Sequence, residues 1–120
     1  MEKKVEETLA IIKRCYDALD DKKAIDIKVL KVAGKSSITD YFVIATGNSE
    51  PHLRALRNAL EKSLDELKLK NIRIDFEPDS GWAVVDGFDF MVHLFLVEQR
   101  ELYGLENLWK DAEVVDIGKI

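Results

Sequence analysis

The run YFVIAT, residues 41–46, constrains the fold of this 120-residue chain more than any other segment. It is apolar up to its final threonine and is rich in aromatic and β-branched side chains. A strand of this kind has no polar face to turn toward water, so it suits the middle of a sheet that is covered on both sides. The sequence therefore predicts a layered protein around a buried central strand.

A helix start follows this strand directly. Ser49 is a suitable N-cap, Glu50 is favoured at the positive end of a helix, and Pro51 suits the first turn. The predicted buried stripe of this helix is Leu53, Leu56, Leu60, Leu64 and Leu67. An earlier amphipathic helix is predicted to end near Asp20 and Asp21. Its apolar stripe is Val5, Leu9, Ile12, Tyr16 and Leu19.

The patterns of the remaining elements are less regular than those of the two helices and the central strand. KAIDIKVLKV, residues 23–32, alternates and then shifts phase at Leu30, which indicates a strand with a bulge near its end. IRID, residues 72–75, indicates a short strand. EQRELYGLENLW, residues 98–109, is helical in its first half and interrupted or redirected at Gly104. The tail KDAEVVDIGKI, residues 110–120, has Val-Val and Ile residues that could pack locally.

The order helix, strand, strand, helix, strand, strand, strand, helix predicts an α+β (α/β-like) fold. We expect a mixed sheet of about five strands flanked by helices. The length suits one domain over residues 1–120, and no repeat or linker divides it. The strand–helix–strand unit from Tyr41 to Ile74 makes a parallel crossover if both strands join one sheet.

The segment GWAVVDGFDFMVHLF, residues 81–95, has the outline of a β-hairpin. A type II′ turn at Gly87-Phe88 would place Asp86 opposite Asp89 and Trp82 opposite His93. Side chains alternate along strands, so the hairpin has two different faces. One is wholly apolar and must be core: Ala83, Val85, Phe90, Val92 and Leu94. The other mixes apolar with polar groups: Trp82, Val84, Asp86, Asp89, Met91, His93 and Phe95.

Three interpretations compete for the mixed face. Another helix can cover it, in which case Trp82 and His93 are partly buried core residues. Alternatively it is exposed and binds a partner, since Trp and Met beside polar groups are typical of an interface core. Catalysis is the weakest interpretation, because Asp86 and Asp89 flank a tight turn and are more often turn formers than paired acids and bases.

Other function classes receive little support from the residues. His52, His93 and the single cysteine, Cys15, show no metal-ligand spacing. The GNS segment before the second helix could suit a small anion, but it lacks a phosphate-binding glycine motif. A net charge of −5 argues against a chain that mainly neutralises nucleic-acid phosphates. With no apolar signal core and no membrane-length apolar run, a soluble cytoplasmic protein is expected.

Three motifs together resemble the Iojap family, whose members are also called ribosomal silencing factors. The first is SSITDYFVIATGNS at residues 36–49. The second is the strand pair WAVVD…DFMVH within residues 82–93, with the pattern WxVVD…DxxVH. The third is LYGLENLW at residues 102–109, with the pattern LYxLExLW. The resemblance covers about residues 18–109. It implies a mixed sheet that resembles a reduced nucleotidyltransferase fold, without the catalytic Gly-Ser and Asp-x-Asp pattern of that superfamily.

The resemblance also implies a function without chemistry. Such proteins bind the large ribosomal subunit through its ribosomal protein fourteen, block joining of the small subunit, and so repress translation when nutrients are scarce. On this chain it implies no catalytic residue, no cofactor, no metal and no direct sequence-specific nucleic-acid or membrane binding. The expected partner-binding residues are Trp82, Met91, His93, Phe95, Tyr103, Leu105, Leu108 and Trp109.

Two rival functions stay open at this point. One is a degenerate nucleotidyltransferase-like enzyme or small-anion-binding domain that uses the helix start at Gly47–Ser49. The other is a homodimeric adaptor that uses the Trp82 face for self-association, and a homodimer is also compatible with ribosome binding.

Overall fold

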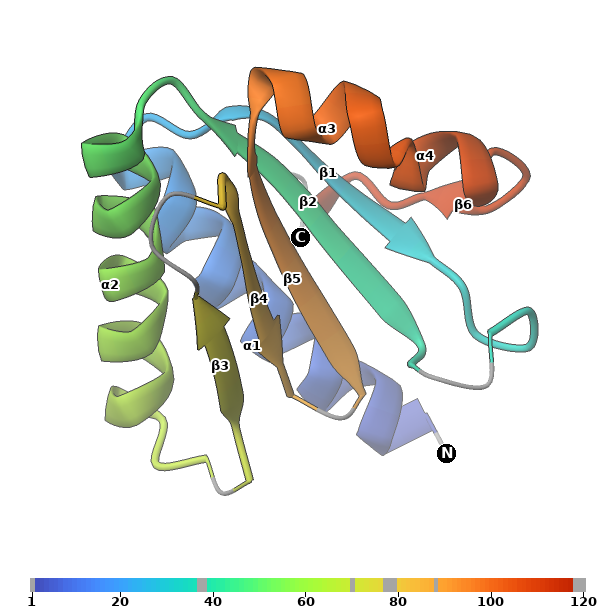
Figure 1. The fold of residues 1–120 in the computed structure, drawn as a ribbon. Coiled ribbons are helices and arrows are strands. Elements are labelled where there is room, and N and C mark those ends of the chain that lie inside the picture. The colour runs from blue at the N-terminus through green and yellow to red at the C-terminus, as the bar shows by residue number, and fades with distance from the viewer. Residues whose placement is uncertain (1, 37–38, 70, 77–79, 88, 118–120) are drawn as a thin grey trace.

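The computed structural model describes residues 2–36, 39–69, 71–76, 80–87 and 89–117. The elements are, in chain order, α1 (Glu2–Asp21), β1 (Ile25–Lys31), β2 (Tyr41–Gly47), α2 (Glu50–Glu66), β3 (Arg73–Phe76), β4 (Trp82–Asp86), β5 (Phe90–Leu96), α3 (Val97–Tyr103), α4 (Leu105–Leu108) and β6 (Glu113–Val114). The strands form one mixed sheet in the order β3-β4-β5-β2-β1-β6, flanked by helices (Figure 1). The predicted α+β class is confirmed.

The described sheet has six strands, one more than predicted. The additional strand, β6, pairs antiparallel with the end of β1 through Leu30↔Val114 and Lys31↔Glu113. Two residues are too few to show an alternating pattern, so this strand could not be predicted from the sequence. Beyond β6 the chain places Ile117 in the main core. Residues 113–117 therefore extend one edge of the sheet and contribute to the main core.

The centre of the sheet is the parallel pair of β2 and β5. All seven residues of β2 are buried, as predicted for residues 41–46. The helix that follows begins with the predicted cap, because Ser49 Oγ accepts a hydrogen bond from the His52 amide and Pro51 lies in the first turn. The pairings make β3 parallel to β2, with β5 and β4 between them. The predicted parallel crossover is thus present and spans two strands.

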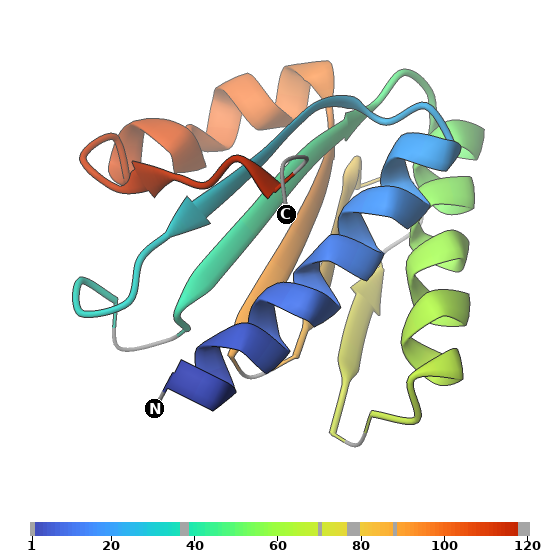
Figure 2. The ribbon, with the colours of Figure 1, turned by 180° about the vertical axis from the view of Figure 1, so that it is seen from behind.

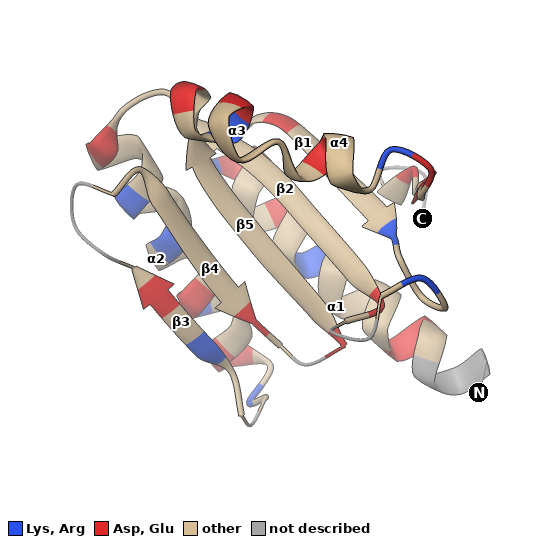
Figure 3. Ribbon diagram, turned by 45° about the vertical axis from the view of Figure 1, so that its right-hand side comes forward, with Lys and Arg blue, Asp and Glu red and all other residues tan. Residues whose placement is uncertain are grey.

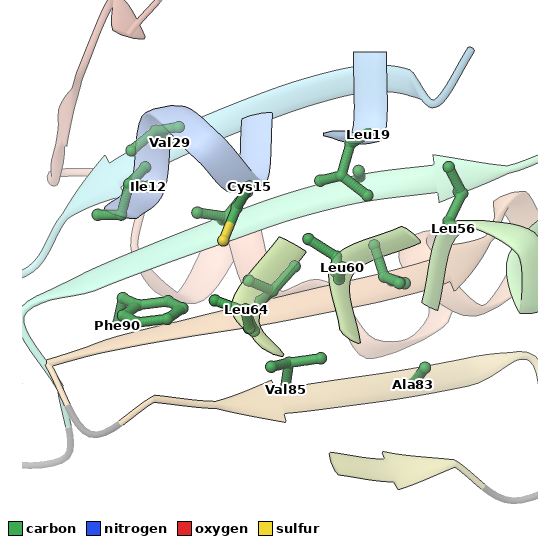
Figure 4. Close-up of a cluster of buried hydrophobic side chains, with 14 of the residues drawn as sticks. Ile12, Cys15, Leu19, Val29, Leu56, Leu60, Leu64, Ala83, Val85 and Phe90 are labelled. Carbon is green, nitrogen blue, oxygen red and sulfur yellow. The ribbon is translucent and has the colours of Figure 1, made fainter. Parts of the chain in front are cut away.

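Helices α1 and α2 cover one face of the sheet (Figure 2). Their buried stripes meet the predicted apolar face of the hairpin in one core (Figure 4). Four of the five predicted α2 leucines are buried, and Leu67 packs against them at the helix end. Cys15 is fully buried here, and burial raises the pKa of its thiol to about 12.

Helices α3 and α4 lie on the opposite face, above β5, β2 and β1 (Figure 1). A second, smaller core forms under them from Leu30, Val32, Phe42, Ile44, Phe95 and Ala112. Trp82, Met91, Leu105 and Trp109 are partly buried against it. This second core explains why β2 has no polar face, because both of its faces are covered.

The bulge in β1 lies at the start of the strand, so the predicted position near its end is wrong. The register with β2 shifts between Ile25 and Lys28, and Asp26 in that interval has a left-handed φ of 49°. The phase shift at Leu30 has another cause. Val29 belongs to the first core and Leu30 to the second, because β1 is covered on both faces at this point.

The predicted register of the hairpin is also wrong, by two residues. Trp82 pairs with Phe95 and Asp86 pairs with Met91, so Asp86 does not face Asp89. The Gly87 amide donates to the Phe90 carbonyl, so Gly87 lies before the turn rather than at its first position as predicted. Phe88 of the predicted turn lies outside the described residues. Because strand side chains repeat every two residues, a shift of two leaves both predicted faces intact.

A candidate partner-docking surface

A continuous array of aromatic rings crosses the mixed face of the hairpin. Tyr103 contacts Trp82 with ring centroids 4.5 Å apart, and Trp82 lies 6.0 Å from His93. His93 in turn lies 5.4 Å from Phe42, and Phe42 lies 5.8 Å from Trp109. The array therefore links β4, β5 and β2 to α3 and to the C-cap residue of α4, with the ring separations that favour aromatic pairs.

Trp82 and His93 are joined by a directed contact within this array. Trp82 Nε1 donates a hydrogen bond of 3.2 Å to His93 Nδ1. An accepting Nδ1 means that the neutral ring carries its proton on Nε2. His93 is only 6% exposed, and burial lowers its pKa to about 4. The imidazole is therefore held neutral at physiological pH, as a fixed acceptor that orients the indole.

The sequence from α3 to α4 brings further apolar groups to the same face. Gly104 ends α3 with a left-handed φ of 58° and is also the N-cap of α4, so the chain changes direction there as predicted. Tyr103 is 50% exposed and Leu108 is 73% exposed, although both are large apolar residues. Leu105 and Trp109 are half-buried against the second core. Exposed apolar groups that surround half-buried ones are typical of an interface.

We define the docking surface as Trp82, Met91, Tyr103, Leu105, Leu108 and Trp109. Two other residues predicted to bind a partner, His93 and Phe95, lie beneath it, with Phe95 only 1% exposed. The structure therefore brings all eight predicted residues to one side of the sheet, six at the surface and two as support. Phe42 belongs to the ring array but was not predicted, because nothing in a wholly apolar strand distinguishes one aromatic residue from its neighbours.

Acidic side chains border the surface on β3 and β4. Cross-strand pairing of Asp75 with Val84 and of Arg73 with Asp86 places these residues on the face of Trp82. Figure 3 shows that β2 and β5, in contrast, carry no Lys, Arg, Asp or Glu. The face therefore has an apolar centre. Its β3–β4 edge carries two acidic residues, Asp75 and Asp86, and one basic residue, Arg73.

The helix start at Gly47–Ser49 is held by hydrogen bonds within the protein. Ser49 Oγ is occupied by the His52 amide, and His52 Nδ1 accepts from the Asn48 amide at 3.0 Å. His52 Nε2 lies 2.7 Å from the Lys22 carbonyl, which ties this turn to the end of α1. A Cβ on Gly47 would lie 3.1 Å from the backbone nitrogen of Leu53, so the turn is packed tightly against the helix.

Two further kinds of site are absent from the described residues. No group of three or more His, Cys, Asp or Glu side chains in this part of the chain is placed to hold a metal ion. Within the same residues, no helix combines the length and the apolar character that crossing a bilayer requires.

Comparison with protein families identifies the chain. The family model described as "Ribosomal silencing factor during starvation" matches residues 5–120. The chain belongs to the ribosomal silencing factor family. This confirms the resemblance to the Iojap family that the three sequence motifs indicated.

Relatives from distant organisms agree with membership of the ribosomal silencing factor family. The chain is 35% identical over 108 residues to the ribosomal silencing factor of Bacillus subtilis, covering 90% of this chain and 92% of that one. It is 33% identical to the chloroplastic protein Iojap of Arabidopsis thaliana, covering 92% of this chain and 46% of that one. A crystal structure of a Chromobacterium violaceum protein superposes with a TM-score of 0.79 at 31% identity, covering 84% of each chain.

Proposed function

We propose that this protein binds the large ribosomal subunit through its ribosomal protein fourteen and blocks joining of the small subunit. Translation is thereby repressed under nutrient limitation. Membership of the ribosomal silencing factor family supports a role on the ribosome. The observation that carries the choice of surface is the ring array that reaches solvent on the face opposite α1 and α2.

In this proposal the residues of the docking surface contact the partner, and the two buried residues beneath it support them. Trp82, Tyr103 and Trp109 are aromatic groups with solvent-accessible area, and such groups dominate the free energy of protein–protein binding. Met91, Leu105 and Leu108 extend the apolar area around them. His93 and Phe95 are buried, so they act by holding the indole of Trp82 in place.

Charge supports a basic partner. The chain has a net charge of −5, and acids of β3 and β4 lie beside the apolar centre of the surface. Complementary charge at a rim accelerates association more than it strengthens the final complex. A basic ribosomal protein fits this surface, and we expect its association rate to fall as salt concentration rises.

The proposed mechanism is excluded volume and requires no catalytic residue or cofactor. A domain bound at the joining face of the large subunit occupies space that the small subunit needs. The protein then acts in stoichiometric amounts rather than by turnover. This distinguishes it from the rival enzyme function, for which substoichiometric protein would suffice.

The test is reassociation of purified ribosomal subunits, followed by light scattering. The wild-type protein should reduce reassociation in proportion to its molar ratio to large subunits. Trp82→Ala should inhibit much less. Val5→Ala is the matched control, since Val5 is an exposed apolar residue on α1, at the other side of the sheet. Full reassociation in the presence of excess wild-type protein would contradict the proposal.

A second copy of the chain is the alternative occupant of the docking surface. Light scattering over a dilution series measures whether the free protein is a monomer or a dimer. If Trp82→Ala dissociates a dimer but leaves subunit binding intact, then the surface serves self-association and the proposed ribosomal contact lies elsewhere.

A further inference from the structure

Helix α4 has few features of its own that would fix its position. It is four residues long, no side chain caps it, and none of its residues is fully buried. Leu105 of α4 and the C-cap residue Trp109 pack against the second core through their apolar side chains. Apolar contact is non-directional, so it stabilises proximity without fixing a position along or around the helix axis. Since α4 supplies part of the docking surface, something else must fix it.

Arg100 of α3 supplies directed contacts at this point. Its Nε donates a hydrogen bond of 2.6 Å to Glu106 Oε1 in α4, and the Arg100 side chain is only 10% exposed. Glu106 Oε2 lies 3.0 Å from Lys28 Nζ on β1, so both carboxylate oxygens are held. The Arg100 hydrogen bond is the main reason why the pKa of Glu106 lies below its usual value.

The other end of the Arg100 guanidinium is anchored in the sheet. Nη1 donates 2.8 Å hydrogen bonds to Thr46 Oγ1 at the end of β2 and to the Asp26 carbonyl. Asp26 lies in the β1 bulge, where the register with β2 is interrupted. Bulges often redirect a group out of the ladder, and this one turns a carbonyl toward the guanidinium. Arg100 thus connects α3, α4, β1 and β2 through one rigid group.

We propose that Arg100 is a positioning residue for the docking surface. Through Glu106 it fixes α4, and so sets where Leu105, Leu108 and Trp109 stand relative to Trp82. The planar fork of arginine suits this role because its donors have fixed relative directions, which a lysine ammonium lacks. The inference rests on the proposed docking function, but the placement of α4 can be tested without a partner.

The first experiment measures amide hydrogen exchange in the free protein. The amides of Asn107, Leu108 and Trp109 bond within the α4 turn. Arg100→Gln and Glu106→Gln should each accelerate their exchange by about tenfold or more, with α2 amides unchanged. Arg14→Gln is the matched control, because Arg14 pairs with Glu66 between α1 and α2 on the other face. Unchanged α4 protection in both variants overturns the proposal.

The second experiment measures the Kd of each variant for purified large subunits. Each single variant should bind about tenfold more weakly, and the double variant should be weakened by less than the sum of the two effects, since both changes break the Arg100–Glu106 contact. Arg100→Lys should not restore wild-type affinity. Ile12→Val, a mildly destabilising change in the first core, should bind normally.

Specific outcomes separate the alternatives. Weaker binding with α4 protection intact overturns positioning, because Arg100 then acts on the partner directly. Lost protection with unchanged affinity overturns it as well. Equal weakening by Ile12→Val assigns the effect to general stability. If wild-type protein does not bind large subunits, the proposed function fails, and the exchange experiment alone decides whether Arg100 fixes α4.

Discussion

The indole of Trp82 donates its hydrogen bond to His93 across neighbouring strands, although the two residues are not register partners. Trp82 pairs with Phe95, and His93 pairs with Val84. The contact is therefore diagonal and spans two positions of the sheet, which a long aromatic side chain can reach. It makes the position of one of the two tryptophans of the docking surface depend on the protonation state of a buried imidazole.

We expect stability to fall on acidification because of His93. Its pKa is about 4 in the folded protein and about 6.5 when unfolded, so the unfolded state binds more protons between these values. The contribution is complete above pH 6.5 and is lost as pH falls toward 4, by roughly 3 kcal/mol. Urea denaturation of wild type and His93→Phe at pH 7 and pH 4.5 measures it. Parallel losses in the two proteins would contradict this origin.

Trp82→Ala should weaken binding to large subunits by about 2 kcal/mol or more, roughly 30-fold in Kd, because it removes a central aromatic anchor. Co-sedimentation at several protein concentrations measures the change. Circular dichroism checks that the variant is folded. Val5→Ala should bind like wild type, since Val5 lies away from the surface. Unaltered co-sedimentation of a folded Trp82→Ala protein would refute the assignment.

Gly81→Ala should destabilise the protein more than Gly34→Ala. Both glycines have left-handed φ, 72° and 82°, so each alanine costs about 1–2 kcal/mol of backbone strain. A Cβ at Gly81 would also lie 2.6 Å from Gln99 Cδ, whereas nothing lies within 4 Å at Gly34. The additional crowding should displace Gln99 and with it α3. The difference between the thermal unfolding midpoints of the two variants measures the destabilisation caused by this crowding. Equal midpoints would show that Gln99 moves aside without loss of stability.

Cys15 should not react with a thiol reagent in the native state. The side chain is fully buried and its thiol pKa is raised to about 12, so reactive thiolate is scarce even when access occurs. Ellman's reagent should label the protein fully in guanidinium chloride and very slowly without it. Because this is the single cysteine of the chain, the slow rate reports opening of the first core. Rapid native labelling would show that α1 separates easily from the sheet.

Much of the fold could be predicted because its signals are local. The Ser49 cap, the leucine stripe of α2 and the apolar run of β2 each depend on residues close in sequence. The hairpin faces were also predicted correctly despite a wrong register, since the alternation is the same after a shift of two. Glu113–Val114 is too short to carry a pattern, which is why β6 was missed.

The docking surface was only partly predictable, because burial there depends on contacts that are distant in sequence. His93 and Trp82 belong to the same mixed face, but His93 also packs against the ring of Phe42 from β2, and it is buried while Trp82 stays partly accessible. Arg100 gave no signal, since its partners Asp26 and Thr46 lie 74 and 54 residues away. An arginine on a charged helix otherwise indicates a solvated side chain.

The parallel pairing of β2 with β5 also has a consequence for how the chain folds. Tyr41 pairs with Phe90 and Gly47 with Leu96, so the two central strands are about fifty residues apart in sequence. During synthesis β2 can pair with β1 early, yet its other edge and the face under α3 and α4 cannot be covered until the C-terminal quarter of the chain has appeared. High contact order of this kind slows folding. An unfinished chain therefore presents one edge of YFVIAT, an apolar and aggregation-prone segment, until β5 has been made.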